Sequence, residues 1–196
     1  MRITMFLLLL IPMLMLSASA SNRMLTAEFE VNAPIEKVWE AWTTPEGIKS
    51  FFAPDCKVDL RVDGAYEIYV APEAKPGERG GEGLRILGLE PLRRFAFTWG
   101  APPTIPYVRG QRTMVILEFE KKGDHRTLVR FTHLGWGEGA SWDEAYEYFA
   151  HAWNEVVLPR FRYAMEVGPV DWKKTPKLPP VAPTLKVTCR AGFHIS

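Results

Sequence analysis

The longest amphipathic segment of the chain, residues 141–168, reads SWDEAYEYFAHAWNEVVLPRFRYAMEVG. It predicts a helix because its apolar residues recur at helical spacing and form one stripe, made of Trp142, Tyr146, Phe149, Ala150, Trp153, Val156 and Val157. Pro159 has no backbone N–H to donate, so we expect a kink there, after which the apolar positions drift to Phe161 and Met165. A stripe of this length must pack on another layer, so the helix limits the chain to folds that provide one.

Segments of alternating apolar and polar residues precede the helix and can supply that layer. Residues 24–31, MLTAEFEV, predict a half-buried strand. Further strands are predicted in KVDLRV, AYEIYV, GLRILGLE, RRFAFTW and the hairpin QRTMVILEFEKKGDHRTLVRFTHLGW. After the first strand, PIEKVWEAWTT and PEGIKSFF predict two short helices. This order predicts an α+β fold in which the long helix covers a curved antiparallel sheet.

The first 20 residues predict an export signal. Arg2 precedes the apolar run ITMFLLLLIPMLML, and Ala18 and Ala20 fit the small-residue pattern of a signal peptidase site. The run is short for a membrane-spanning helix, which needs about 20 apolar residues, and no later segment could cross a bilayer. We therefore expect a signal peptide at 1–20, one domain at 21–168 and a proline-rich tail at 169–196. The protein would be periplasmic or secreted, or anchored to the membrane if the signal is not cleaved.

Charge and cysteine content exclude several kinds of site. The net charge is +1 and no cluster of Lys and Arg is long enough to follow a phosphate backbone, so no nucleic-acid partner is expected. The glycine-rich stretches lack the strand–turn–helix context of a dinucleotide site, so we predict no cofactor. Cys56 and Cys189 have no CxxC or nearby His partner, so we predict no metal site. An oxidising compartment would permit a disulfide between them, which the sequence leaves open.

Aromatic residues make up 12% of the chain, with seven Trp, which is more than a core of this size needs. This surplus favours an apolar cavity between sheet and helix, with hydroxyl or indole groups as polar contacts. The predicted ligand-binding residues are Tyr66, Ile68, Phe97, Trp99, Phe131, His133, Tyr146, Phe149, Trp153 and Arg160. The alternative, that these rings only pack the core, stays open. The loop at 100–110, GAPPTIPYVRG, is long and apolar enough to cover a cavity mouth.

Two polar residues in this set have alternative roles. His133 shares a strand face with Val129 and Phe131, which directs it toward the cavity as a polar anchor or general base, unless it is a hydrogen-bonded structural residue. Arg160 follows the expected kink on the inward stripe, where an unpaired guanidinium is costly to bury. It either clamps a ligand carboxylate, or turns to solvent, or pairs with a nearby Glu.

The chain resembles the Activator of Hsp90 ATPase homologue-like domains of the START-like, or SRPBCC, helix-grip superfamily. The resemblance lies in EVNAPIEKVWEAWTTPEGIKSFFAP, VDLRVDGAYEI, ILGLEPLRRFAFTW, LVRFTHLGW and HAWNEVVLPRF, in this order over about residues 24–168. It implies a curved antiparallel sheet of about six or seven strands wrapped on a long C-terminal helix, often around an apolar cavity. It does not imply one reaction, because members bind lipids or other apolar molecules, act on aromatic or polyketide substrates, or stimulate a chaperone ATPase.

The sequence leaves three functions open. The first is an exported, non-enzymatic domain that binds an apolar small molecule, lipid-like or aromatic, between sheet and helix. The second is a cyclase, hydrolase or lyase in which His133, Glu67 or Arg160 would be the candidate group, since the chain has no recognisable catalytic motif. The third is a chaperone-like or envelope interaction module that uses the proline-rich tail. The export signal disfavours a co-chaperone of cytosolic Hsp90.

Overall fold

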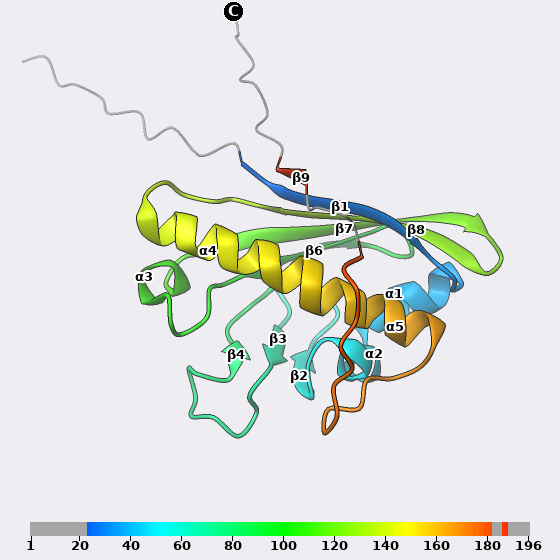
Figure 1. Ribbon diagram of the computed structural model, residues 1–196, viewed down its shortest axis with the longest axis horizontal. Helices are drawn as coiled ribbons and strands as arrows, with labels where there is room; N and C mark the ends of the chain where they lie inside the picture. The colour runs from blue at the N-terminus through cyan, green and yellow to red at the C-terminus, as the bar shows by residue number, and fades with distance from the viewer. Residues whose placement is uncertain (1–22, 182–185, 188–196) are drawn as a thin grey trace, which may run out of the picture.

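The largest layer in the computed structural model is a six-stranded antiparallel sheet, shown in Figure 1 above the long helix. The structure describes residues 23–181 and 186–187, so the predicted signal at 1–20 lies outside the described residues. The strands of the sheet lie in the order β5 (Ile86–Glu90), β6 (Arg94–Trp99), β7 (Thr113–Gly123), β8 (Arg126–Leu134), β1 (Leu25–Val31) and β9 (Lys186–Val187). The first strand of the chain therefore lies next to the last strand of the central run, and the predicted α+β fold is confirmed.

The two faces of this sheet differ because side chains alternate along each strand. On the inner face, Phe29 of β1 lies opposite Val129 of β8, and both are buried. On the outer face, Arg130 of β8 binds Glu28 of β1 at 2.7 Å and Glu120 of β7 at 2.9 Å. The register thus brings apolar residues together on the side that faces the helix and opposite charges together on the solvent side.

A second, smaller sheet consists of the three strands β2 (Asp55–Val58), β3 (Tyr66–Tyr69) and β4 (Gly80–Gly81). The two sheets join where β5 begins, because the Tyr66 N–H donates to the Leu84 carbonyl and the Ile86 N–H donates to the Gly64 carbonyl. The buried Tyr66 hydroxyl also donates to the Trp42 carbonyl at 2.8 Å. Together these bonds bring the small sheet against the two short helices.

The two short helices after β1 are confirmed as α1 (Ile35–Thr43) and α2 (Pro45–Phe51). Thr44 separates them, and its hydroxyl accepts a hydrogen bond from the Gly47 N–H at the start of α2. Trp42 of α1 packs on Phe51 with ring centroids 4.8 Å apart and on Phe161 of the long helix at 5.3 Å. The pair of helices therefore closes one end of the space between the sheet and the long helix.

The long helix is continuous but irregular. It consists of α4 (Ala140–His151), a π-helical turn (Ala152–Val157) and α5 (Leu158–Glu166). In the π turn the Leu158 N–H donates to the carbonyl of Trp153, five residues earlier. We expected a kink at Pro159, and the structure has a widened turn just before the proline. The extra residue rotates the buried stripe, so the next fully buried residue after Trp153 is Leu158.

The described part of the predicted tail lies against the domain. The Val170 N–H donates to the Ser50 carbonyl at 2.8 Å, and the Trp172 indole donates to the Lys49 carbonyl at 2.7 Å. We call residues 170–181 the strap, because in Figure 1 this segment runs over the long helix toward β9. Within the described residues, no helix combines the length and apolar composition needed to span a membrane.

Candidate functional site

Most of the predicted ligand-binding residues lie in an interior filled by rings. Tyr66 packs on Phe97 with ring centroids 4.5 Å apart, and Phe131 packs on Trp153 at 4.7 Å. At the other end of the helix, Tyr146 packs edge-on against Trp136 at 5.0 Å. Ile68 is fully buried in the same cluster. Around these side chains the sheet and helix are in direct contact, so the aromatic surplus serves packing here.

His133 is at the centre of a chain of hydrogen bonds in this interior. The indole N–H of Trp153 donates to His133 Nδ1 at 3.0 Å. An indole only donates, so Nδ1 is unprotonated and the proton of the neutral ring is on Nε2, which lies 2.7 Å from the hydroxyl oxygen of Thr113. Thr113 in turn donates to the carbonyl of Trp99 at 3.2 Å. The chain connects the π turn to β8, β7 and the end of β6.

Burial keeps His133 neutral. Its side chain has 0% exposure, and desolvation lowers its pKa from 6.5 to about 3. Both ring nitrogens already have partners, so neither is available to remove a proton from a ligand. Of the two alternatives that the sequence left open, the geometry supports the structural one.

A groove opens on the surface beside the π turn, with a volume of about 210 Å³. We call it the π-turn groove; its wall is mostly apolar and consists of Phe52, Val70, Trp99, Tyr148, Phe149, His151, Ala152, Trp153, Val156, Val157 and Arg160. Trp99, Phe149, Trp153 and Arg160 were predicted as ligand-binding residues. Val70 and Tyr148, which are 61% and 46% exposed, add exposed apolar surface to its wall.

Arg160 is the permanently charged side chain of this groove. It is half-buried, and desolvation lowers its pKa. Among the described residues it forms no ion pair or hydrogen bond, and its guanidinium lies 5.5 Å from the ring centroid of Trp172 in the strap. It therefore does not pair with Glu, and its nitrogens are not among the buried polar atoms without a partner, so the guanidinium reaches solvent at the groove.

Comparison with known proteins identifies the family. The family model described as Activator of Hsp90 ATPase homolog 1-like protein matches residues 32–165. The chain belongs to this family. A search of curated proteins finds no match.

Solved structures of low sequence identity share the helix-grip fold of the family. The Aha1 dimer from Colwellia psychrerythraea aligns with a TM-score of 0.54 and 22% identity over 74% of this chain and 97% of that one. An Hsp90 activator from Plasmodium falciparum aligns with a TM-score of 0.52 and 16% identity over 69% and 90% of the chains. A protein from Mesorhizobium loti aligns with a TM-score of 0.53 and 20% identity over 70% of this chain and 90% of that one. At these identities the likeness establishes the fold alone.

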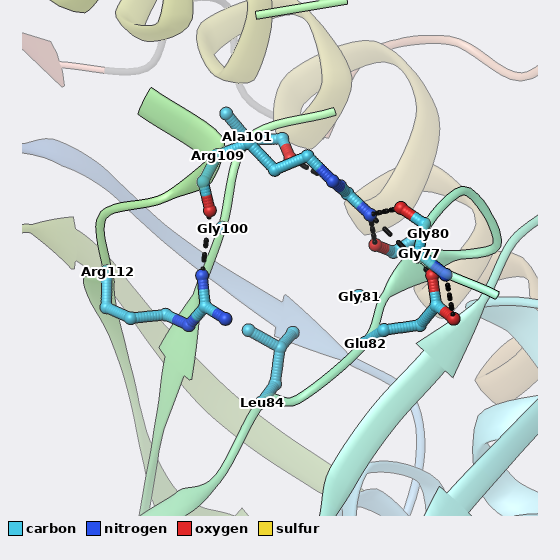
Figure 2. A pocket seen from close by; sticks show the side chains of 9 residues that line it. All are labelled: Gly77, Gly80, Gly81, Glu82, Leu84, Gly100, Ala101, Arg109 and Arg112. Carbon is cyan, nitrogen blue, oxygen red and sulfur yellow. Dashed lines mark hydrogen bonds and ion pairs between the residues drawn. The ribbon is translucent and has the colours of Figure 1, made fainter. Parts of the chain in front are cut away.

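A second pocket of about 180 Å³ lies where this helix-grip domain carries its two long loops, and Figure 2 shows it from close by. Arg109, at the end of the short helix α3 (Pro106–Arg109), donates to the carbonyls of Ala101 at 2.7 Å and of Gly77 and Gly80, the latter at 3.2 Å. It also lies 3.6 Å from the carboxylate of Glu82. The loop expected to cover a cavity mouth is thus tied to the neighbouring loop and does not line the π-turn groove.

The remaining polar residues that the sequence singled out are Glu67, Cys56 and Cys189. The Tyr69 hydroxyl and the Gly83 N–H both donate to Glu67, so this carboxylate holds a turn of the small sheet. Cys56 is a free thiol whose pKa burial raises to about 11, and Cys189 lies outside the described residues. Within the part of the chain that the structure describes, no group of side chains is placed to bind a metal ion.

Sequence reasoning missed much of the groove wall and the whole strap. Val156 and Val157 were placed on the buried stripe and not in a site. Their place in the groove follows from the π turn, which makes the step between the buried residues Trp153 and Leu158 five residues long. Trp172 could not be found by periodicity, because the strap contains many prolines and has no repeating pattern.

Proposed function

We propose that this domain is an exported, non-enzymatic binding protein that holds a compact apolar molecule with one acidic group in the π-turn groove. The observation that carries the proposal is the position of Arg160, a half-buried guanidinium with no counterion among the described residues, at an apolar groove. A carboxylate or sulfonate would pair with it in the two-pronged geometry that arginine favours. The ion pair would replace the solvation that burial removes.

The size of the groove supports a compact ligand over an extended lipid. Its volume of about 210 Å³ is smaller than the roughly 300–1,000 Å³ of most drug-sized sites. Trp99, Phe149 and Trp153 line it with rings, and aromatic rings favour stacked or edge-on contacts with another ring. An aromatic acid therefore matches this wall better than a long acyl chain does.

An enzymatic function has less support. His133, the main candidate for a general base, has both nitrogens bound inside the fold and does not line the groove. Glu67 does not line it either.

A second candidate function is stimulation of a chaperone ATPase. The family description supports it, as do the titles of the Colwellia and Plasmodium structures, an Aha1 dimer and an Hsp90 activator. We place it second because the predicted export signal would separate this chain from cytosolic Hsp90. Adding the chain without residues 1–20 to an Hsp90 ATPase assay tests it, and a several-fold stimulation would put it first.

A pair of fluorescent probes tests the binding proposal. 1-Anilinonaphthalene-8-sulfonate and N-phenyl-1-naphthylamine share one ring system, and only the first carries an acidic group. We expect both to bind the chain without residues 1–20, the sulfonate more tightly. Arg160→Gln should weaken sulfonate binding at least tenfold and leave binding of the neutral probe unchanged. Equal loss of both probes would contradict the clamp.

The second test fills the π-turn groove with a larger side chain. Val157→Trp places a ring in the groove wall and should abolish binding of both probes. Val167→Trp is the matched control, because Val167 is 71% exposed and does not line the groove. Ala152→Phe repeats the test from another wall if Val157→Trp does not fold, as judged by thermal unfolding. Unchanged binding in a folded filled variant would show that the probes bind elsewhere.

A further inference from the structure

The strap forms a second pocket, open to solvent, that Arg160 also lines. This strap chamber has a volume of about 290 Å³ and is lined by Glu155, Val156, Arg160, Pro176, Lys177 and Leu178. It shares Val156 and Arg160 with the π-turn groove. Arg160 therefore lines both a mostly apolar groove formed by the helix and sheet and a more polar pocket formed by the helix and strap.

Trp172 fixes the position of that guanidinium. Its indole N–H is bound to the Lys49 carbonyl at 2.7 Å, which ties the ring to the C-terminal part of α2. The guanidinium of Arg160 lies over this ring, an arrangement in which the π face attracts the cation without neutralising its charge. This contact with Trp172 uses none of the hydrogen-bond donors of Arg160.

The charges around the chamber favour an anion. Arg160 and Lys177 contribute two positive charges, and Glu155 contributes one negative charge. Glu155 lies 3.2 Å from Nδ1 of His151 and makes no ion pair with Arg160 or Lys177. One positive charge therefore remains uncompensated within the lining, and an acidic group of a ligand would balance it.

We propose that the strap completes the ligand site: the ring system of the ligand occupies the π-turn groove, and its acidic group enters the strap chamber between Arg160 and Lys177. This inference rests on the proposed function. It assigns Lys177 as a residue that contacts the acidic group and Trp172 as a positioning residue that acts through Arg160. The C-terminal strap, rather than the helix-grip domain alone, then determines that the protein selects acids over neutral molecules of the same shape.

Strap variants and the two probes test this assignment. Trp172→Leu and Lys177→Gln should each weaken binding of 1-anilinonaphthalene-8-sulfonate about fivefold and change binding of N-phenyl-1-naphthylamine less than twofold. Lys174→Gln is the matched control, because it removes the same charge from an exposed strap residue that does not line the chamber. It should leave the affinity for both probes unchanged. A merely structural role of Trp172 would lower both affinities together.

The two proposals fail in distinguishable ways. If the wild-type chain binds neither probe, or if a folded Val157→Trp variant binds both, the proposed function is wrong. A different result would overturn only the strap assignment. In that result the wild-type chain binds both probes and Arg160→Gln weakens only the sulfonate, but the strap variants change neither affinity or change both equally. The proposed site in the π-turn groove would then be supported, and the proposed role of the strap chamber would be wrong. The strap assignment would also be wrong if Lys174→Gln lowers the affinity for the sulfonate as much as Lys177→Gln does. The effect would then come from the general charge of the strap.

Discussion

The two pockets beside the long loops and beside the π turn each contain one half-buried arginine, and the two arginines have different surroundings. Arg109 has four oxygen partners, the carbonyls of Ala101, Gly77 and Gly80 and the carboxylate of Glu82 (Figure 2). Arg160 has the ring of Trp172 and no oxygen partner among the described residues. The comparison suggests a simple distinction. A buried polar group with partners inside the fold stabilises the fold, whereas one without partners beside an apolar groove is available to a ligand.

His133 provides the strongest test of this distinction, because it is fully buried and both nitrogens have partners. His133→Leu should lower the free energy of unfolding by about 3 kcal/mol, since it leaves the Trp153 indole and the Thr113 hydroxyl without their partner. Urea unfolding measures the loss. The control is His125→Leu, at an exposed position, which should change stability by less than about 0.5 kcal/mol. Comparable losses in the two variants would mean that the hydrogen-bond chain contributes nothing.

The same histidine predicts a pH dependence. Its pKa in the folded state, about 3, lies below the value near 6.5 of an unfolded chain, so between these values the unfolded state binds a proton that the folded state does not. Stability should therefore fall as the pH falls below about 6.5, at up to about 1.4 kcal/mol per pH unit from this group. Lowering the pH from 7 to 5 should cost the wild-type protein about 2 kcal/mol more than a His133→Gln variant, which has no titrating ring. Parallel stability curves would contradict the neutral, buried state of His133.

These cases also separate what the sequence could predict from what it could not. The alternation of Val129, Phe131 and His133 correctly places all three on the inner face of β8. It could not tell a cavity from a filled interior, because both need the same inward-facing rings, and only the packing of side chains from distant strands decides between them. The fold was predictable from the order of elements and from the family resemblance.

The site was less predictable than the fold, for reasons of local geometry. Arg160 was expected on the inward side of the helix, and in the structure it lines a groove that opens on the surface. The groove itself depends on a π turn, which changes the helical phase by one residue and has no strong composition signal. The strap depends on single contacts, such as the bond from Trp172 to Lys49, that no periodic pattern encodes.

Replacing Arg109 should lower the stability of the fold, but by less than replacing His133 does. Arg109→Met leaves the carbonyls and Glu82 without their shared donor, so we expect a loss of about 2 kcal/mol in the free energy of unfolding. Arg112→Met is the matched control in the same pocket; its exposed guanidinium donates to the carbonyls of Arg109 and Gln111, and we expect less than half of that loss. Neither variant should alter the affinity for either probe. A loss of sulfonate binding in Arg109→Met would show that the two pockets are not independent.

Of His133, Arg109 and Arg160, we expect replacement of Arg160 to change stability least and probe binding most. Arg160→Met removes a cation–π contact worth about 0.5–1 kcal/mol, but it also removes a desolvated charge with no counterion among the described residues, so the two changes offset each other. We expect the free energy of unfolding to change by less than about 1 kcal/mol in urea titrations, while the sulfonate probe loses its preferred site. A loss above about 2 kcal/mol would mean that Arg160 holds the fold together as Arg109 does. Its charge would then be needed by the protein in the absence of any ligand, and the distinction between the two arginines would fail.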